Sequence, residues 1–241
     1  MRFDIITLFP ELFTPFMQSG INRRAFEMQA DGQKLVDVRF SNPRDFAQGN
    51  YRRVDDRPFG GGPGMLMMAE PLACAVEAVQ AERQDSAPVV LFSPIGRSLN
   101  HALVARFAQD SSSDTGAILI CGRYEGLDQR FIDQFVTEQI SLGDFVLSGG
   151  EIAAVALLDA VARLQPNVLK DADSHAQDSF NPAVGGLLDC PHYTRPEEWR
   201  GHTVPPVLMS GNHGQIERWR TEQRQTLTEK LRPDLLGKPL G

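Results

Sequence analysis

The chain has 241 residues, of which 41% are hydrophobic and 23% are charged. This composition supports a packed globular fold and excludes a disordered chain or a coiled coil. The net charge of −7 argues against a generic polyanion binder, and three widely spaced cysteines argue against a disulfide framework or a zinc ribbon. No run approaches the roughly 20 apolar residues of a membrane span, and no signal peptide is recognisable, so we expect a cytoplasmic protein without membrane contact.

Strand and helix patterns alternate along the first two thirds of the chain. The runs that predict strands are residues 2–9, 34–40, 88–92, 116–121 and 139–147. Apolar residues at helical spacing follow Pro71, the cap candidate Asn100, and Gly150, whereas the Gly-rich stretch 55–67 has no predicted element. This order predicts an α/β fold with a mostly parallel sheet, in which ligands bind beyond the carboxyl ends of the strands.

The alternation stops near Pro166, which suggests a domain of residues 1–166. Residues 167–186 are rich in Asp, Ser, Asn, Pro and Gly and predict a flexible linker, and residues 187–241 predict a small helical domain with a helix from about Gly214 to Leu231. From residue 191 onward there are eight Lys or Arg and six Asp or Glu, so this stretch carries +2 and the rest −9. A basic tail suits contact with nucleic acid phosphates, and a solvated helix explains the same charges.

Three Gly-bearing loops, at 93–98, 122–126 and 143–151, follow three successive predicted strands. Loops at one sheet edge can surround a ligand with backbone polar groups. Neither GxGxxG nor GxxxxGK[ST] occurs, which favours a ligand held through an adenine edge and a ribose over a dinucleotide or a triphosphate. The alternative is that these glycines only end helices and form tight turns.

Individual titratable residues allow two interpretations each. Glu125 could face a ribose hydroxyl or a cationic group, or it could satisfy donors at a helix N-terminus. Arg163 ends a predicted helix, where the helix dipole alone favours an arginine. Asp178 in the linker could be carried over a substrate as a general base, or it could form an ordinary turn.

The nearby residues Asp189, Cys190 and His192 are of types that can bind a metal ion. The spacing matches no recognised metal motif, and we expect instead a packed turn before a helix that begins at Pro196.

Longer motifs carry a resemblance to a known family. They are VDDRPFGGGPGMLM, SPIGR, CGRYEG, ISLGDFVLSGGE, DSF, GLLDCPHYTRPE and VPPVLMSGNH. In this order they closely resemble the bacterial tRNA (guanine-N1)-methyltransferases that modify guanine 37, next to the anticodon. The likeness extends from Phe3 to about Leu236.

The resemblance implies a methyltransferase of the SPOUT class: an α/β fold with a deep trefoil knot, a small all-α C-terminal domain that grips the anticodon stem, and a homodimer with shared active sites. It implies S-adenosylmethionine as methyl donor, assistance from magnesium, Asp178 as general base and Arg163 as its partner. The residues expected to hold the donor are Pro94, Gly122, Tyr124, Glu125, Gly126, Leu142, Gly143, Leu147, Gly149 and Gly150.

The chemistry of guanine is consistent with this assignment. Guanine N1 bears a proton at neutral pH, so methylation there needs a base, and a positive group near O6 stabilises the developing charge. Two alternatives stay open: another α/β nucleoside-binding enzyme, and a catalytically silent knotted RNA-binding protein.

Overall fold

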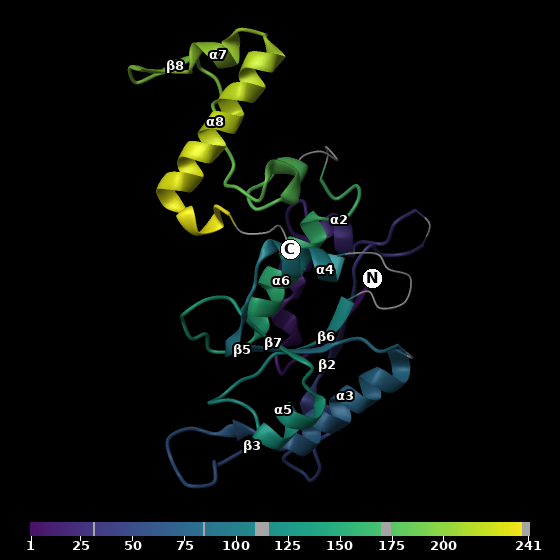
Figure 1. The fold of residues 1–241 in the computed structure, drawn as a ribbon. Helices are drawn as coiled ribbons and strands as arrows, with labels where there is room; N and C mark the ends of the chain where they lie inside the picture. The colour runs from purple at the N-terminus through teal and green to yellow at the C-terminus, as the bar shows by residue number, and fades with distance from the viewer. Residues whose placement is uncertain (31, 84, 109–115, 170–174, 238–241) are drawn as a thin grey trace. The chain divides into compact units, whose positions relative to one another are not determined.

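The computed structural model describes residues 1–30, 32–83, 85–108, 116–169 and 175–237 (Figure 1). The chain divides into two units, Met1–Leu169 and Lys170–Gly241. Within the described residues, no helix combines the length and the apolar character needed to cross a bilayer.

The first unit is built on a five-stranded sheet in the order β2-β1-β6-β5-β7. The strands are β1 (Arg2–Ile6), β2 (Asp37–Ser41), β5 (Val89–Ser98), β6 (Gly116–Ile120) and β7 (Glu138–Ser141). Every neighbouring pair is parallel, so all carboxyl ends lie at one edge. This arrangement confirms the predicted α/β fold with a parallel sheet.

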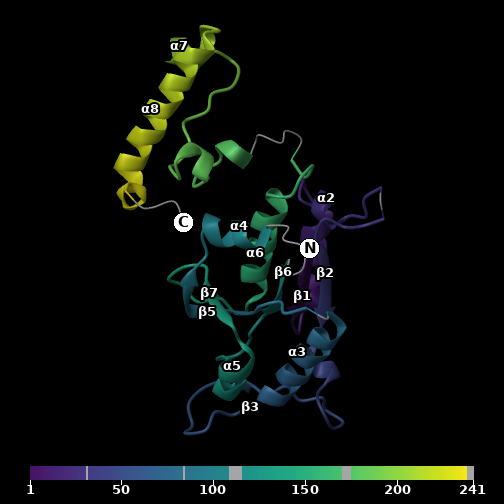
Figure 2. The same ribbon diagram turned by 45° about the vertical axis from the view of Figure 1, so that its right-hand side comes forward.

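Helices cover both faces of this sheet because its central strands are apolar on both sides. Along β6, Ala117 and Leu119 belong to one buried cluster, and Ile118 and Ile120 belong to the other. The first cluster includes residues of α2 (Arg23–Phe26), α4 (His101–Ala108) and α6 (Glu151–Arg163), with α1 (Thr14–Gln18) packed beside it. The second includes residues of α3 (Ala69–Arg83) and α5 (Gln129–Phe135). Figure 2 shows α3 and α5 on the opposite side of the strands from α4 and α6.

Several short elements of this unit were not predicted. They are α1, α2, α5, the 3₁₀ turns η1 (Pro10–Leu12) and η2 (Pro43–Asp45), and the antiparallel pair β3 (Asp55–Asp56) and β4 (Leu66–Met67). Helix α5 begins where the Asp128 side chain accepts a hydrogen bond from the Arg130 amide at 2.9 Å. With only seven residues, it offers too short a periodic pattern to detect.

The second unit contains α7 (Pro206–Met209), α8 (His213–Leu231) and the 3₁₀ turns η3 (His175–Gln177), η4 (Pro182–Val184) and η5 (Pro233–Leu235). Asn212 caps α8 by accepting a hydrogen bond from the Gln215 amide at 3.2 Å. Within the predicted linker, residues 170–174 lie outside the described ranges, and η3 and η4 lie in the remainder.

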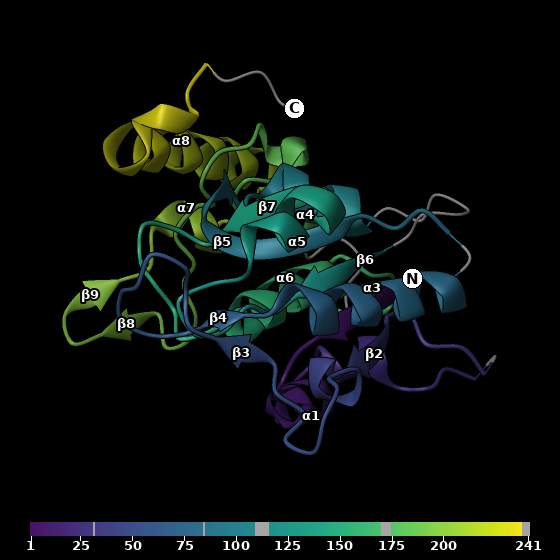
Figure 3. The same cartoon turned by 90° about the horizontal axis from the view of Figure 1, so that it is seen from below.

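Two expectations for this second unit were wrong. It is not all-α, and no helix begins at Pro196, because β8 (Glu198–Trp199) pairs with β9 (His202–Thr203) in a small hairpin. Arg200 and Gly201 join these strands with φ values of 53° and 81°. Positive φ at both turn positions matches the twist of a two-residue hairpin, which overrides the helix signal of a proline. Figure 3 shows both short antiparallel pairs, β3–β4 and β8–β9.

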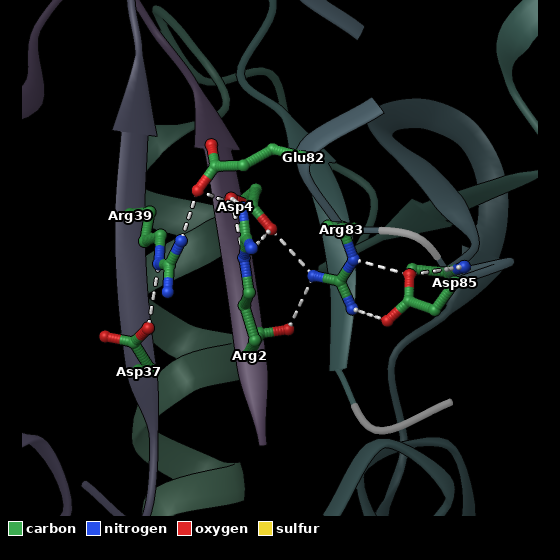
Figure 4. Close-up of polar contacts among 8 residues, drawn as sticks. Arg2, Asp4, Asp37, Arg39, Glu82, Arg83 and Asp85 are labelled. Carbon is green, nitrogen blue, oxygen red and sulfur yellow. Dashed lines mark hydrogen bonds and ion pairs between the residues drawn. The ribbon is translucent and has the colours of Figure 1, made fainter. Parts of the chain in front are cut away.

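An ion-pair network ties the end of α3 to the start of β1 (Figure 4). The Arg83 side chain is fully buried, and its Nη1 donates to Asp4 Oδ2 at 2.7 Å and to the Arg2 carbonyl at 3.0 Å. Its Nε and Nη2 donate to the two oxygens of Asp85 at 2.7 and 2.9 Å. All of these groups lie at the edge of the sheet where β1 begins, away from the carboxyl ends.

Asp85→Asn should lower the free energy of unfolding by about 1–2 kcal/mol at pH 7, because it weakens two charge-assisted hydrogen bonds to Arg83. Those hydrogen bonds hold the pKa of Asp85 below its ordinary value. A lowered carboxylate pKa stabilises the fold above about pH 4, and this stabilisation disappears as the pH falls through the lowered pKa. Urea unfolding should therefore find a smaller difference between the variant and the wild type at about pH 3.

The control is Glu77→Gln, which removes an exposed carboxylate from α3, the helix that carries Arg83. It should leave stability nearly unchanged at both pH values. Equal losses in the two variants would contradict a specific role for the Asp85 pair.

Candidate active site

A cavity of about 270 Å³ lies at the carboxyl ends of β5, β6 and β7. The three Gly-bearing loops line it together, as expected for loops that follow parallel strands. The predicted donor-site residues that line it are Pro94, Gly122, Tyr124, Glu125, Gly126, Leu142, Leu147, Gly149 and Gly150. Gly143 is the one member of the predicted set that does not.

The first loop is a bulge in β5. Phe92 is the partner of Ile140 on β7, and after an irregularity Arg97 is the partner of Ile140 again. Residues 93–96 therefore project from β5, which pairs with β7 both before and after them. Gly96 packs directly on that neighbour, since a Cβ there would lie 2.4 Å from the Ile140 nitrogen.

The second loop, 122–126, is fixed to the Gly-rich stretch before β4. The Glu125 amide donates to the Met65 carbonyl at 3.0 Å, and the Met67 amide donates to the Gly126 carbonyl at 2.8 Å. A Cβ on Gly64 would lie 2.3 Å from Glu125 Cγ, so only glycine leaves room for this carboxylate beside the stretch. The stretch that had no predicted element thus holds Glu125 in the cavity wall.

Tyr124 belongs to the same loop and adopts a positive φ of 60°. Burial raises the pKa of its phenol, and the nearby carboxylate of Asp55 raises it further. The phenol therefore stays protonated at neutral pH and is available as a hydrogen-bond donor.

The third loop leads from β7 into α6. The Gly150 amide donates to the Gly122 carbonyl at 3.0 Å, and a Cβ on Gly150 would lie 2.7 Å from Cys121 Cα. Gly143 shapes the beginning of the loop, since its amide donates to Ser141 Oγ at 3.1 Å and its carbonyl accepts from the Phe145 amide at 2.9 Å. This turn leads to Phe145, which is part of the cavity wall.

The remaining cavity residues were not predicted as donor-site residues, although some of them lie in the three predicted loops. They are Leu91, Phe92, Ser93, Arg123, Leu127, Ile132, Ile140, Ser141, Phe145, Val146, Ser148 and Ala153. Ile132 lies on the unpredicted helix α5. Arg123 stands inside the CGRYEG motif, and its Nε lies 3.0 Å from Oε2 of Glu151, the last residue of LSGGE. In the sequence, this pair could have been suspected only from the opposite charges of two residues in two of the motifs.

Arg163 and Asp178 lie in different units. Arg163 ends α6, twelve residues after Glu151, and at the rise of an α-helix it lies about 18 Å from the cavity end of that helix. Asp178 directly follows η3, and its amide donates to the His175 carbonyl at 3.3 Å.

The group of Asp189, Cys190 and His192 brings its ligand atoms within 4.8 Å of one another. His192 Nε2 lies 2.8 Å from Asp189 Oδ2, and Arg224 Nε lies 3.4 Å from Asp189 Oδ1. Burial raises the pKa of the Cys190 thiol, with Asp189 adding to it. These polar contacts within the second unit explain why the three residues lie close together, and they are consistent with the expected packed turn.

A family model for tRNA (Guanine-1)-methyltransferase TrmD matches residues 1–238. The chain belongs to this family. The motifs quoted from the sequence had predicted this membership, which assigns the chain to the tRNA guanine-N1 methyltransferases of the SPOUT class.

Curated relatives support the family assignment along nearly the whole chain. A tRNA (guanine-N(1)-)-methyltransferase of Albidiferax ferrireducens is 72% identical over 98% of this chain and 92% of its own length. A protein with the same name from a Polaromonas species is 66% identical over 99% of this chain and 90% of its own length. Another, from Leptothrix cholodnii, is 56% identical over 98% of this chain and 91% of its own length.

Proposed function

We propose that this protein transfers the methyl group of S-adenosylmethionine to N1 of guanine 37 in tRNA. The family match over residues 1–238 supports the reaction type, and the cavity that all three loops line supports a compact donor site. The reaction forms a bond between N1 and the methyl carbon, breaks the bond between that carbon and sulfur, and releases S-adenosylhomocysteine and one proton.

The cavity suits the proposed donor because its lining combines apolar side chains with backbone polar groups. Leu142, Phe145 and Leu147 offer apolar surface for an adenine ring, and the glycines of the second and third loops expose N–H and C=O groups. Glu125 is the lining carboxylate suited to a ribose hydroxyl or the donor's ammonium group. S-adenosylmethionine supplies an activated methyl group when bound.

Two side chains outside the cavity are proposed to act on guanine. The carboxylate of Asp178 accepts the N1 proton, which makes N1 nucleophilic. The guanidinium of Arg163 offsets the negative charge that develops on O6. The C-terminal unit, with its excess of positive charge after residue 190, holds the anticodon stem.

A homodimer with shared sites accounts for the position of Arg163. This arginine lies about 18 Å from the cavity end of its own helix, far from a base beside its own cavity, which supports its supply by a second subunit. Val146 lines the cavity and is 85% exposed. Ile95 and Ile152 are the sequence neighbours of the lining residues Pro94 and Ala153 and are 83% and 59% exposed. Large apolar side chains exposed together are typical of a surface that another subunit covers.

The trefoil knot also belongs to this proposal. After β7, at the outer edge of the sheet, the chain returns past β5 so that Gly150 contacts Cys121 and Gly122 at the end of β6. A return of this kind is compatible with the proposed knot, which in addition requires the chain to pass through a loop.

The proposal also includes assistance from magnesium and a location in the cytoplasm. Among the described residues, the one group of three candidate metal ligands is Asp189, Cys190 and His192. A buried thiol does not suit magnesium, which prefers hard oxygen ligands, so this group is not proposed as the magnesium site. Magnesium is usually held by one or two carboxylates together with water and phosphate oxygens, so we propose that it assists together with the RNA. The proposed location is the cytoplasm, where tRNA is available.

The full-length protein should bind S-adenosylmethionine without RNA and should methylate a transcript with guanine at position 37. Calorimetry and a radiolabelled methyl-transfer assay measure the two steps, and a transcript with adenine at position 37 is the control. Donor binding without transfer would indicate a silent RNA-binding protein. Hydrolysis of a nucleoside ligand without donor binding would indicate a different enzyme.

Asp178→Asn should lower the single-turnover rate by roughly 10²- to 10⁴-fold, because an amide cannot accept the N1 proton. Donor affinity should hardly change. Arg163→Ala should lower the rate separately, and the double variant should lose less than the product of the single losses, because the two groups act on one charge. A near-normal rate for Asp178→Asn would leave substrate positioning as the role of this residue.

Mixing two inactive variants tests the shared site. A Gly150→Val subunit and an Asp178→Asn subunit should regain part of the activity after subunit exchange, because one of the two sites in the heterodimer is then intact. Exchange is monitored by mass spectrometry, and each variant alone is the control. No recovery after complete exchange would contradict a site shared between subunits.

A further inference from the structure

Glu151 is a buried carboxylate at the cavity edge for which the proposed mechanism has no use. It is the first residue of α6 and is 1% exposed. Its Oε1 accepts hydrogen bonds from Thr7 Oγ1 at 2.8 Å and from Arg123 Nε at 3.1 Å. Its Oε2 is buried without a hydrogen-bond partner and lies 3.0 Å from the same nitrogen. Burial of a carboxylate is unfavourable unless nearby positive charge offsets it.

Two positive features lie beside the same cavity. Arg123 lines it, and its position is fixed because Nη1 donates to the Ser148 carbonyl at 3.2 Å and its guanidinium lies 4.4 Å from the centre of the Phe9 ring. The N-terminus of α6 begins at Gly150, which also lines the cavity, and a helix N-terminus carries partial positive charge. Without a compensating anion, both features would oppose the entry of a cation.

The geometry brings the pair close to the cavity wall. A Cβ on Gly149 would lie 2.3 Å from Arg123 Nε and 2.5 Å from Glu151 Oε2. Gly149, which lines the cavity with Arg123, therefore packs directly against the ion pair. In a site shielded from water, a charge at such a position affects a bound ion strongly.

The proposed donor is such an ion. S-adenosylmethionine carries a sulfonium, and its product S-adenosylhomocysteine carries a neutral thioether in the same place. A residue that sets the electrostatic potential of the cavity therefore affects the affinity of the donor more than that of the product. A residue that only maintains the shape of the cavity affects both to the same extent.

We propose that Glu151 is a positioning residue that offsets the charges of Arg123 and of the α6 N-terminus and so allows the cavity to accept a cationic donor over its neutral product. This inference rests on the proposed binding of S-adenosylmethionine. It assigns the Glu151–Arg123 pair a role in discriminating between donor and product.

Calorimetric titration of the full-length protein with each ligand tests the role. In Glu151→Gln, the loss of affinity for S-adenosylmethionine should exceed the loss for S-adenosylhomocysteine by about tenfold, which Coulomb's law gives for two charges roughly 12 Å apart at an effective dielectric constant of about 20. Arg123→Gln should shift the ratio of the two affinities the other way. The double variant should return it near the wild-type value, and Glu151→Asp, which keeps the charge, should preserve it.

Glu138→Gln is the matched control. Glu138 is a partly buried carboxylate of β7 that pairs with Arg106 and does not line the cavity. Its replacement should leave the ratio unchanged. Equal losses of both ligands in Glu151→Gln, or an unshifted ratio in Arg123→Gln, would overturn the inference, and the second variant keeps the test valid where the first fails to fold. Wild-type protein that binds neither ligand would instead refute the donor proposal.

Discussion

The first turn of α6 approaches the end of β6 so closely that no side chain fits between them. A Cβ on Gly150 would lie 2.7 Å from Cys121 Cα, and the Gly150 amide donates to the Gly122 carbonyl. This contact joins the loop after β7 to the loop after β6 and brings Glu151 to Arg123. The cavity, its charged edge and the orientation of α6 all depend on this one approach.

The sequence was a good guide to the sheet and its long helices. The central strands are buried on both faces, and such strands are continuous apolar runs that are visible in one sequence. Asn100 was expected to cap a helix, and its side chain accepts a hydrogen bond from the Leu103 amide at 2.9 Å. The short elements were missed because seven residues or fewer contain too little periodicity, and the hairpin near Pro196 depends on backbone angles at Arg200 and Gly201 that no periodic pattern reveals.

The position of the candidate site could be predicted from the sequence, but not all of its residues. Loops that follow successive parallel strands must meet at one edge, so a shared cavity follows from topology. The individual residues of the cavity wall do not follow from topology. Phe145 enters the wall through a turn at Gly143, and Glu125 is held by the Gly-rich stretch before β4, far away in the sequence. The Arg123–Glu151 pair joins residues 28 positions apart, and only the folded chain brings them together.

The bulge in β5 has a consequence for ligand binding. Residues 93–96 are bounded on both sides by pairing with the same residue, Ile140. Ordering a flexible loop around a ligand costs roughly 1–2 kcal/mol of conformational entropy per residue. Here the loop ends are already fixed by the sheet, so this part of the cavity is preorganised and most of that cost falls on folding rather than on binding.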